Sequence, residues 1–538
     1  MIPVLSASLF LPRGRMSTWL VLGGETISSV TLAPDTLIWT HLGIGVLGTL
    51  ALRARLGALE CHFTWELDNT RSNVLYLRDK LKDIGTDQGN PWLGHIYNLR
   101  AHIHFQLASQ EDTTGSTLED ALRCFGTAAE ALRQVRNTAS YEGPWLLVNY
   151  GNLAWLHFHM EEHAESLVYV GKVEALLQEY PSPIQEQLHQ EVLAEKAWTL
   201  MNFGPASKSK AVEYFTKAIE VEPDMVEWTT SHALALSISS KDPSPEQKAN
   251  ILKVLRRATE RDPDNLYIVA VYLKRLAETG EAIEDQARKL AKKVLRRPQS
   301  LYSGIRPLLR LYRRYGSLDE AIGVAKEASD RHPNARHLKD CLARCYMWKV
   351  FSDDRDSLLI HSLRERAIVL YTEVVKLYPY TFLKAKISLA KLYAARHNKM
   401  ESDEIFKELL ATVEYMVEWT TSHALALSIS SKDPSPEQKA NILKVLRRAT
   451  ERDPDNLYIA AVYLERLAET GGAIEDQARK LAERVLRRPQ SIYSGIRPLL
   501  RLYRRFGSLD EAIDVAKEAS DRHPNARHLK DCLARCYK

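Results

Sequence analysis

The chain has 538 residues, 45% of them hydrophobic and 26% charged, with only 24 Gly and 22 Pro, which is typical of an ordered, helix-rich protein. Six Cys in so long a chain exclude a disulfide framework and favour a reducing compartment. The net charge of +5 is small, so any argument for nucleic-acid binding depends on where the positive charge lies.

Residues 1–59 differ from the rest of the chain. Their start lacks the basic residues and the cleavage site of a secretory signal, and the apolar stretch Leu37 to Leu52 is short for a bilayer span. We therefore expect no stable membrane association. We interpret residues 1–59 as an atypical apolar extension, either disordered or an artefact of the gene model.

From Glu60 onward, apolar residues recur at helical spacing between short breaks, and no stretch alternates as a strand would. The segment LLRLYRRYGSLDEAIGVAKEASDRHPN fits the 34-residue tetratricopeptide pattern through Leu308, Tyr312, Gly316, Ala321, Ala325, Ala328 and Pro333. Small Ala residues let two antiparallel helices pack closely, Gly permits the turn, and Pro ends the second helix. Residues 60–415 are thus predicted to form an all-α tetratricopeptide-repeat superhelix, with a concave surface made mainly by the first helix of each pair.

A second, longer period overlies the first. The segment Met225 to Tyr346 is repeated from Met416 to Tyr537 with only eight differences. Structural repeats diverge far more, so we interpret residues 416–538 as a copied block, either a recent duplication or a gene-model error, on a solenoid that tolerates such insertions. The copied block contains no counterpart of the segment around Trp198, so we expect it to form no complete second binding site. Its last helix should leave apolar surface exposed.

Positive charge gathers between Gln286 and Leu318, where ten Lys or Arg occur without an acidic residue. A solvated charged face is the default interpretation of such a run. With Gly316 at repeat position 15, however, four concave-facing positions fall on Arg306, Arg310, Arg313 and Arg314. Arg is suited to bidentate phosphate contacts, and crowded guanidiniums repel one another unless an anion is bound.

Several segments resemble one known family. The segments CHFTWEL (Cys61 to Leu67), YGNLAWLHFHM, AWTLMNFG (Ala197 to Gly204), YFTKAIEVEPD, DPDNLYI and LYRRYGSLDEAI occur in the order seen in the interferon-induced proteins with tetratricopeptide repeats. This resemblance implies a cytoplasmic effector of antiviral innate immunity, whose superhelix binds the 5′ ends of single-stranded RNA, triphosphate or cap, in a basic channel. It also implies other family members or a second copy as partners, and no cofactor.

The resemblance assigns channel roles to Trp198, Glu227, Asn265, Tyr267, Arg306 and Arg313, with Trp198 as a stacking platform for a base or cap. On sequence alone Trp198 is equally compatible with a core position, and Asn265 with a helix cap. The sequence departs from the family at three places: Ile238 replaces an Arg, Asn202 replaces a Lys, and Asp340 with Cys341 replaces a His-Gln pair. Lys208, Arg310 and Arg314 are candidates to restore the lost charge. We expect an altered or weaker preference for the 5′ end.

Two chemical motifs receive a structural interpretation. His159 and His163 fit an HxxEH pattern, but they fall at a turn between repeat helices, whereas a zinc site needs both on one helix face. His337, Cys341 and Cys345 lie at helical spacing, and core cysteines are the simpler explanation. No phosphate-binding loop or catalytic constellation occurs, so we predict neither a metal nor an enzyme. The alternative function is a scaffold whose concave arginines bind acidic peptides or partner proteins.

Overall fold

The computed structural model describes residues 21–22, 25–26 and 48–537, except for the gaps 85–89, 111–116, 136–141, 185–186, 240–242, 298–303, 353–356, 378–382, 397, 413–434, 453, 455, 488–491 and 523–526. Most of the predicted extension and the start of the copied block, residues 416–434, therefore lie outside the described residues. Near the N-terminus, β1 (Val21–Leu22) pairs with β2 (Glu25–Thr26) in antiparallel register.

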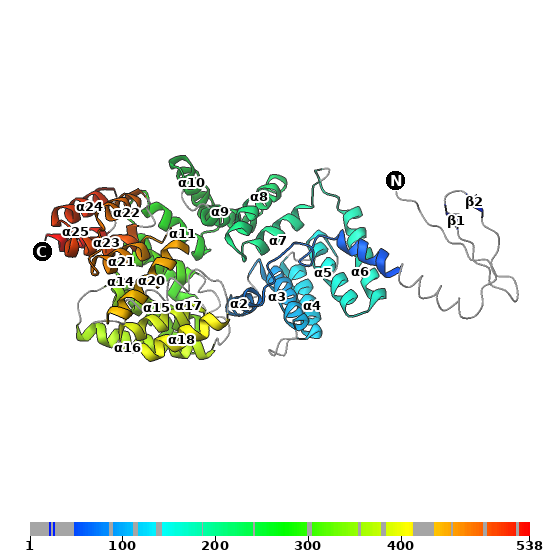
Figure 1. Ribbon diagram of the computed structural model, residues 1–538. Coiled ribbons are helices and arrows are strands. Elements are labelled where there is room, and N and C mark those ends of the chain that lie inside the picture. The colour runs from blue at the N-terminus through cyan, green and yellow to red at the C-terminus, as the bar shows by residue number, and fades with distance from the viewer. Residues whose placement is uncertain are drawn as a thin grey trace.

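Helices make up the rest of the described structure, and they stack as successive antiparallel pairs along an elongated array (Figure 1). The first half contains α2 (Arg71–Ile84), α3 (Leu93–Ser109), α4 (Leu118–Val135), the 3-10 turn η1 (Pro144–Leu146), α5 (Leu147–His159), α6 (His163–Glu179), α7 (Gln190–Leu200), α8 (Pro205–Val221), α9 (Val226–Ser239) and α10 (Pro245–Arg261). The next helices are α11 (Leu266–Ala277), α12 (Glu284–Arg296), α13 (Ile305–Tyr315), α14 (Leu318–Arg331), α15 (Arg336–Ser352), α16 (Leu358–Leu377), α17 (Leu383–Ala395) and α18 (Lys399–Thr412). The copied block contributes α20 (Pro436–Arg452), α21 (Leu457–Ala468), α22 (Glu475–Arg487), α23 (Ile492–Phe506), α24 (Leu509–Arg522) and α25 (Arg527–Cys536).

Local sequence explains where several of these helices begin and end. Ser244 and Gln247 form a capping box at the start of α10, each side chain accepting a hydrogen bond from the other residue's backbone N–H. At Gly316, between α13 and α14, a Cβ atom would lie 2.8 Å from Cδ1 of Tyr312. Only Gly fits this close approach without a shift of the ring.

Small residues form the contact between paired helices, as the repeat pattern predicts. Ala321, Ala325 and Ala328 of α14 are fully buried, and so are Ala211 and Ala218 of α8. One continuous apolar core extends from α11 to α17, and Leu308, Leu309 and Tyr312 belong to it. The predicted all-α tetratricopeptide superhelix is confirmed.

Packed helix is also found ahead of Glu60. Residues 48–57 are helical, and Leu52 and Leu56 belong to the core that α4, α5 and α6 share. Arg55 forms an ion pair with Glu174 of α6 at 2.7 Å. No helix in the described part of the chain is long and apolar enough to cross a bilayer.

The copied block has a core of its own, built from α21 to α25. Its last helix, α25, also lies against α13 of the first copy. Tyr537 is 64% exposed, whereas its counterpart Tyr346 is 4% exposed beneath the helices that follow it. Apolar surface is exposed beside the last helix, as expected.

Candidate nucleic-acid interface

The helix α13 is divided into an apolar and a basic side. Leu308, Leu309 and Tyr312 are buried, whereas Arg306 and Arg310 are exposed. Arg313 is also exposed, and Arg314 is partly buried. The predicted division of α13 agrees with this exposure pattern, since the same helix directs its leucines into the core, and the binding role of the four arginines stays a prediction.

The preceding helix, α12, accounts for the remainder of the basic run. Its Lys289, Lys292 and Lys293 are exposed, and Arg288 pairs with Asp285 at 3.0 Å and Glu320 at 3.1 Å. These cations behave as the solvated face that is the default for a charge run. The run thus divides between two helices, and only its second half belongs to the candidate site.

Nine cations from five helices form what we call the basic cluster: Lys80 of α2, Lys208 of α8, Lys274 and Arg275 of α11, Arg306, Arg310, Arg313 and Arg314 of α13, and Arg344 of α15. Burial, together with the charges of Arg314, Arg344 and Arg310, lowers the pKa of Arg313 to about 10. Burial also lowers the pKa of Arg310, with Arg344 and Arg306 adding to the effect. These guanidiniums are open to solvent yet enclosed by protein and by like charge, so a bound anion would be favourable there.

One end of the basic cluster involves α2, α8 and the N-terminal end of α13. Nζ of Lys80 donates a hydrogen bond to Oδ1 of Asn202 at 2.7 Å. Burial, together with the charges of Lys208 and Arg306, lowers the pKa of Lys80 to about 8. This end therefore joins three cations from helices far apart in sequence.

Asp340 of α15 lies beside the same end and is completely buried. Nη2 of Arg344 donates to both of its carboxylate oxygens, at 2.8 and 3.0 Å, and Nη2 of Arg306 lies 3.5 Å from Oδ2. The carboxylate thus neutralises part of the charge that Arg306 and Arg344 would offer to a ligand.

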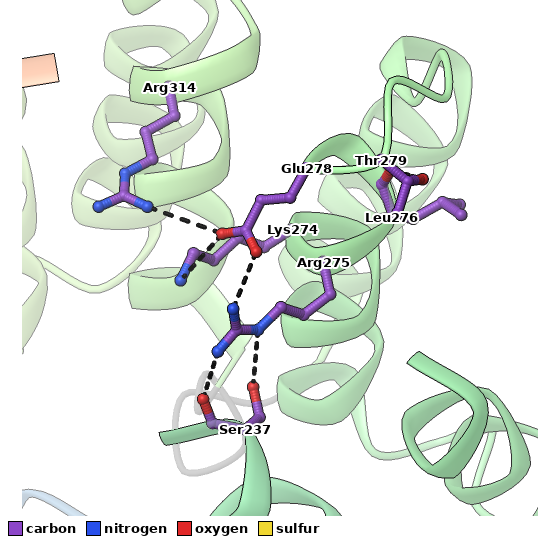
Figure 2. A network of polar contacts seen from close by, with 7 residues as sticks. All are labelled: Ser237, Lys274, Arg275, Leu276, Glu278, Thr279 and Arg314. Carbon is purple, nitrogen blue, oxygen red and sulfur yellow. Dashed lines mark hydrogen bonds and ion pairs between the residues drawn. The ribbon is translucent and has the colours of Figure 1, made fainter. Parts of the chain in front are cut away.

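The other end of the basic cluster is centred on Glu278 (Figure 2). Its carboxylate lies 2.9 Å from Arg275, 3.7 Å from Lys274 and 3.9 Å from Arg314. Arg275 is held further by Ser237 of α9, to whose Oγ it donates at 3.1 Å and whose carbonyl oxygen it also contacts. Within the described part of the chain, Arg310 and Arg313 have no carboxylate partner, and Arg313 instead lies 4.8 Å above the Trp348 ring.

Trp198 lies near the Lys80 end and is partly buried. Its ring stacks on Trp92, with 5.8 Å between centroids and 15° between planes. Its carbonyl oxygen accepts a hydrogen bond from Asn202 at 2.9 Å. One ring face therefore serves the core, and the role of a stacking platform stays a prediction for the other.

Comparison with known proteins gives a consistent result. No family model matches the chain. The human antiviral innate immune response effector IFIT1 is 24% identical over 485 residues, covering 86% of this chain and 94% of the effector. Human interferon-induced protein with tetratricopeptide repeats 2 is 30% identical over 304 residues, which cover 56% of this chain and 61% of that relative.

Among solved structures, the human IFIT1 dimer with m7Gppp-AAAA matches with a TM-score of 0.60 at 23% identity, covering 88% of this chain and 99% of the other. The same dimer with PPP-AAAA matches with a TM-score of 0.55 at 22% identity, covering 87% and 99%. Over most of its length, this chain is thus similar to interferon-induced proteins with tetratricopeptide repeats.

The positions that carry the family resemblance have local roles in this structure. Asn265 is the N-cap of α11, where its Oδ1 accepts a hydrogen bond from the N–H of Ile268 at 3.3 Å. Of the two interpretations of Asn265 from the sequence, the helix cap is therefore seen in the structure. Tyr267 is partly buried and electrostatically coupled to Arg310. Glu227 is partly buried in the first turn of α9. Contacts of these residues with RNA stay predictions.

Four members of the basic cluster on other helices are absent from the sequence-based site: Lys80, Lys274, Arg275 and Arg344. No predicted site residue falls on α2, although Lys80 lies directly before the buried Leu81 in its helical pattern. Arg344 follows Asp340 by one helical turn, and this i, i+4 spacing is the signal that would have revealed the pair. Ile238, at the position of the family's Arg, is 42% exposed on α9.

The two set-aside motifs have structural explanations. His159 ends α5 and His163 begins α6, so the HxxEH residues do not share one helix face. Cys341 and Cys345 are buried, and burial raises the pKa of both thiols. No group of His, Cys, Asp or Glu among the described residues has the arrangement of a metal site.

Proposed function

We propose that this protein is a cytoplasmic antiviral innate-immunity effector that binds single-stranded RNA by its 5′ end, triphosphate or cap, in a basic channel inside the superhelix. The observation that carries the proposal is the basic cluster, in which five helices direct Lys and Arg side chains toward one region. Burial and neighbouring like charges lower the pKa values of Lys80, Lys274, Arg310 and Arg313, and a bound phosphate would offset both causes.

At one end of the basic cluster, Lys80, which the charges of Lys208 and Arg306 influence, is connected to Trp198 through Asn202, which accepts a hydrogen bond from Lys80 and donates one to the Trp198 carbonyl oxygen. We assign the 5′-terminal phosphates to this end, with the open face of Trp198 available to a base or cap. Glu227, Asn265 and Tyr267 would line the path of the first nucleotides. The family relatives with m7Gppp-AAAA and PPP-AAAA bound support this assignment.

According to this proposal, the protein functions by binding RNA and not by catalysis. Its protein partners are other family members or a second copy of the chain. The human relative whose structure is a dimer supports the last part. All six cysteines are described and remain free thiols, which fits a reducing compartment.

The experiment compares one RNA sequence with a 5′ triphosphate, a cap or a 5′ hydroxyl, using fluorescence anisotropy with the full chain. We expect tighter binding of the triphosphate or capped RNA and loss of that preference in Arg306→Glu plus Arg313→Glu. The copied block offers a matched control, Arg497→Glu plus Arg504→Glu, which should leave the preference intact. Affinity should also fall with salt, with a log–log slope of about −0.7 per phosphate contact.

Equal affinity for all three 5′ ends, in the wild type and in the first double variant, would refute the proposal. Competition by an acidic peptide with no effect of the 5′ end would favour the scaffold alternative instead.

A further inference from the structure

The copied block provides an internal comparison for the basic cluster. Of the eight differences between the copies, two replace Lys by Glu: Lys274 becomes Glu465, and Lys292 becomes Glu483. Lys292 is exposed on α12, on the solvated part of the basic run. Lys274, by contrast, belongs to the basic cluster, so its replacement changes the candidate site itself.

In the first copy, the Glu278 end of the cluster has an excess of positive charge. Lys274, Arg275 and Arg314 all lie within 4 Å of the one carboxylate. Arg275 is fixed by Ser237 as well as by Glu278, whereas Lys274 and Arg314 lie at the longer distances of 3.7 and 3.9 Å. Figure 2 shows the Lys274 and Arg314 side chains approaching the same oxygen of Glu278.

In the second copy, the same place is electrically balanced. Arg505, the counterpart of Arg314, lies 2.9 Å from Glu469 and 3.6 Å from Glu465. Arg466, the counterpart of Arg275, lies 2.8 Å from Glu469. Two guanidiniums therefore face two carboxylates, and no charge is left for an anion to neutralise.

We propose that Lys274, together with Arg314, binds a backbone phosphate of the RNA downstream of the 5′ end, and that Glu465 removes this contact from the second copy. The inference rests on the proposed function, because it assumes that the 5′-terminal phosphates bind at the opposite end of the cluster. It adds Lys274 to the binding residues and gives the two copies different capacities for anions.

The charge state of Lys274 supports this role. Burial is the main cause that lowers its pKa to about 8; Glu278 opposes this shift, and Arg314, Arg275 and Arg310 contribute to it. An ammonium group with a depressed pKa gains more from a nearby phosphate than an unperturbed one, because the phosphate offsets both causes.

Geometry separates the two phosphate contacts along the RNA. Arg306 and Arg314 lie near opposite ends of α13, about 12 Å apart along the axis at 1.5 Å per residue. A mononucleotide bound at Lys80, Lys208 and Arg306 would not reach Lys274, whereas an oligonucleotide that follows α13 would. The role of Lys274 should therefore depend on the length of the ligand.

The experiment measures the affinity of the full chain for GTP and for a 5′-triphosphate RNA decamer. We expect Lys274→Glu to weaken binding of the decamer about tenfold or more and to reduce its salt slope by about 0.7, with GTP affinity unchanged. Lys274→Gln, which adds no charge beside Glu278, should have a smaller effect in the same direction. The control Lys292→Glu makes the same charge change on the solvated part of the basic run and should leave both affinities within about twofold of the wild type.

The outcomes distinguish this inference from the proposed function. Normal decamer binding by Lys274→Glu, with loss of binding by Arg306→Glu plus Arg313→Glu, would overturn the inference alone. Normal binding by the double-Arg variant would overturn the proposed function. An equal loss for GTP and the decamer in Lys274→Gln would show that Lys274 does not bind a downstream phosphate. Misfolding is not expected, since the second copy already accommodates a Glu beside Glu469.

Discussion

Replacement of Asp340 by Asn is expected to change stability and RNA affinity in opposite directions. The Asp340 carboxylate is completely buried, and its ion pairs with Arg344 and Arg306 hold both guanidiniums in place. Removing one partner of a fully buried pair costs about 3–5 kcal/mol of unfolding free energy. The side chains of Arg344 and Arg306 are 29% and 43% exposed, so water screens their charges once the carboxylate is removed. We therefore expect Asp340→Asn to lower the free energy of unfolding by about 1–3 kcal/mol.

The same carboxylate opposes an incoming phosphate. A phosphate on the open side of Arg306 would lie roughly 8 Å from Asp340, given that Arg306 is itself 3.5 Å from Asp340. Two unit charges at roughly 8 Å repel by about 2 kcal/mol at an effective dielectric constant of 20, and by about 0.5 kcal/mol in bulk water. Asp340→Asn should therefore tighten binding of 5′-triphosphate RNA by about 2-fold to 30-fold.

Thermal unfolding of the free protein and fluorescence anisotropy with 5′-triphosphate RNA measure the two effects separately. The matched control is Asp531→Asn, at the equivalent position of the copied block, which should leave RNA affinity unchanged. Weaker RNA binding by Asp340→Asn would refute the reasoning, because it would mean that Asp340 positions the arginines for the phosphate rather than competing with it.

Three further changes test other parts of the site and core. Burial lowers the pKa of Lys80 to about 8, so the Lys80 side chain loses its positive charge between pH 7 and pH 9. Over this range, the affinity for 5′-triphosphate RNA, measured by anisotropy, should fall up to about tenfold. Lys80→Arg should reduce that fall. Burial raises the pKa of Glu195 to about 8, so the folded state holds a proton that the unfolded state loses above about pH 4.5. Stability in urea should decrease from pH 5.5 to pH 8, and Glu195→Gln should abolish the decrease. Trp198→Ala should cost about 1–3 kcal/mol of RNA-binding free energy if its open face stacks on a base, and Trp198→Phe should retain most of it; unchanged RNA binding by the Ala variant would leave Trp198 a core residue.

The fold and one wall of the site could be predicted from the sequence because both follow from a single helical register. The spacing of Ala321, Ala325 and Ala328 fixes how α14 packs, and all three are fully buried. The same register puts Leu308 and Tyr312 in the core, which directs the arginines of α13 away from it. A strict repeat therefore predicts which side of each helix is exposed.

The opposite wall could not be predicted in this way, because it depends on contacts between distant helices. Nothing local indicates that Lys80 of α2 meets Asn202 at the end of α7, since the two positions are far apart in sequence. Burial of Asp340 is equally invisible, as a charged residue on a helix is normally expected at the surface. The distribution of charge in the basic cluster therefore cannot be predicted from the sequence alone.

These two contacts change the meaning of the departures from the family. Asn202 stands where the family has a Lys, yet the ammonium of Lys80 lies 2.7 Å from its side chain, so positive charge is present at that place from another helix. Asp340 stands in place of a polar pair, and Arg344 one turn later supplies the cation that balances it. Ile238 differs, because its apolar side chain is 42% exposed on α9. Neighbouring charge thus compensates the Asn202 departure, whereas Arg344 only balances the buried carboxylate of Asp340. No such compensation is seen at Ile238 among the described residues, so Ile238→Arg is expected to strengthen RNA binding in the same anisotropy assay, and unchanged affinity would contradict this.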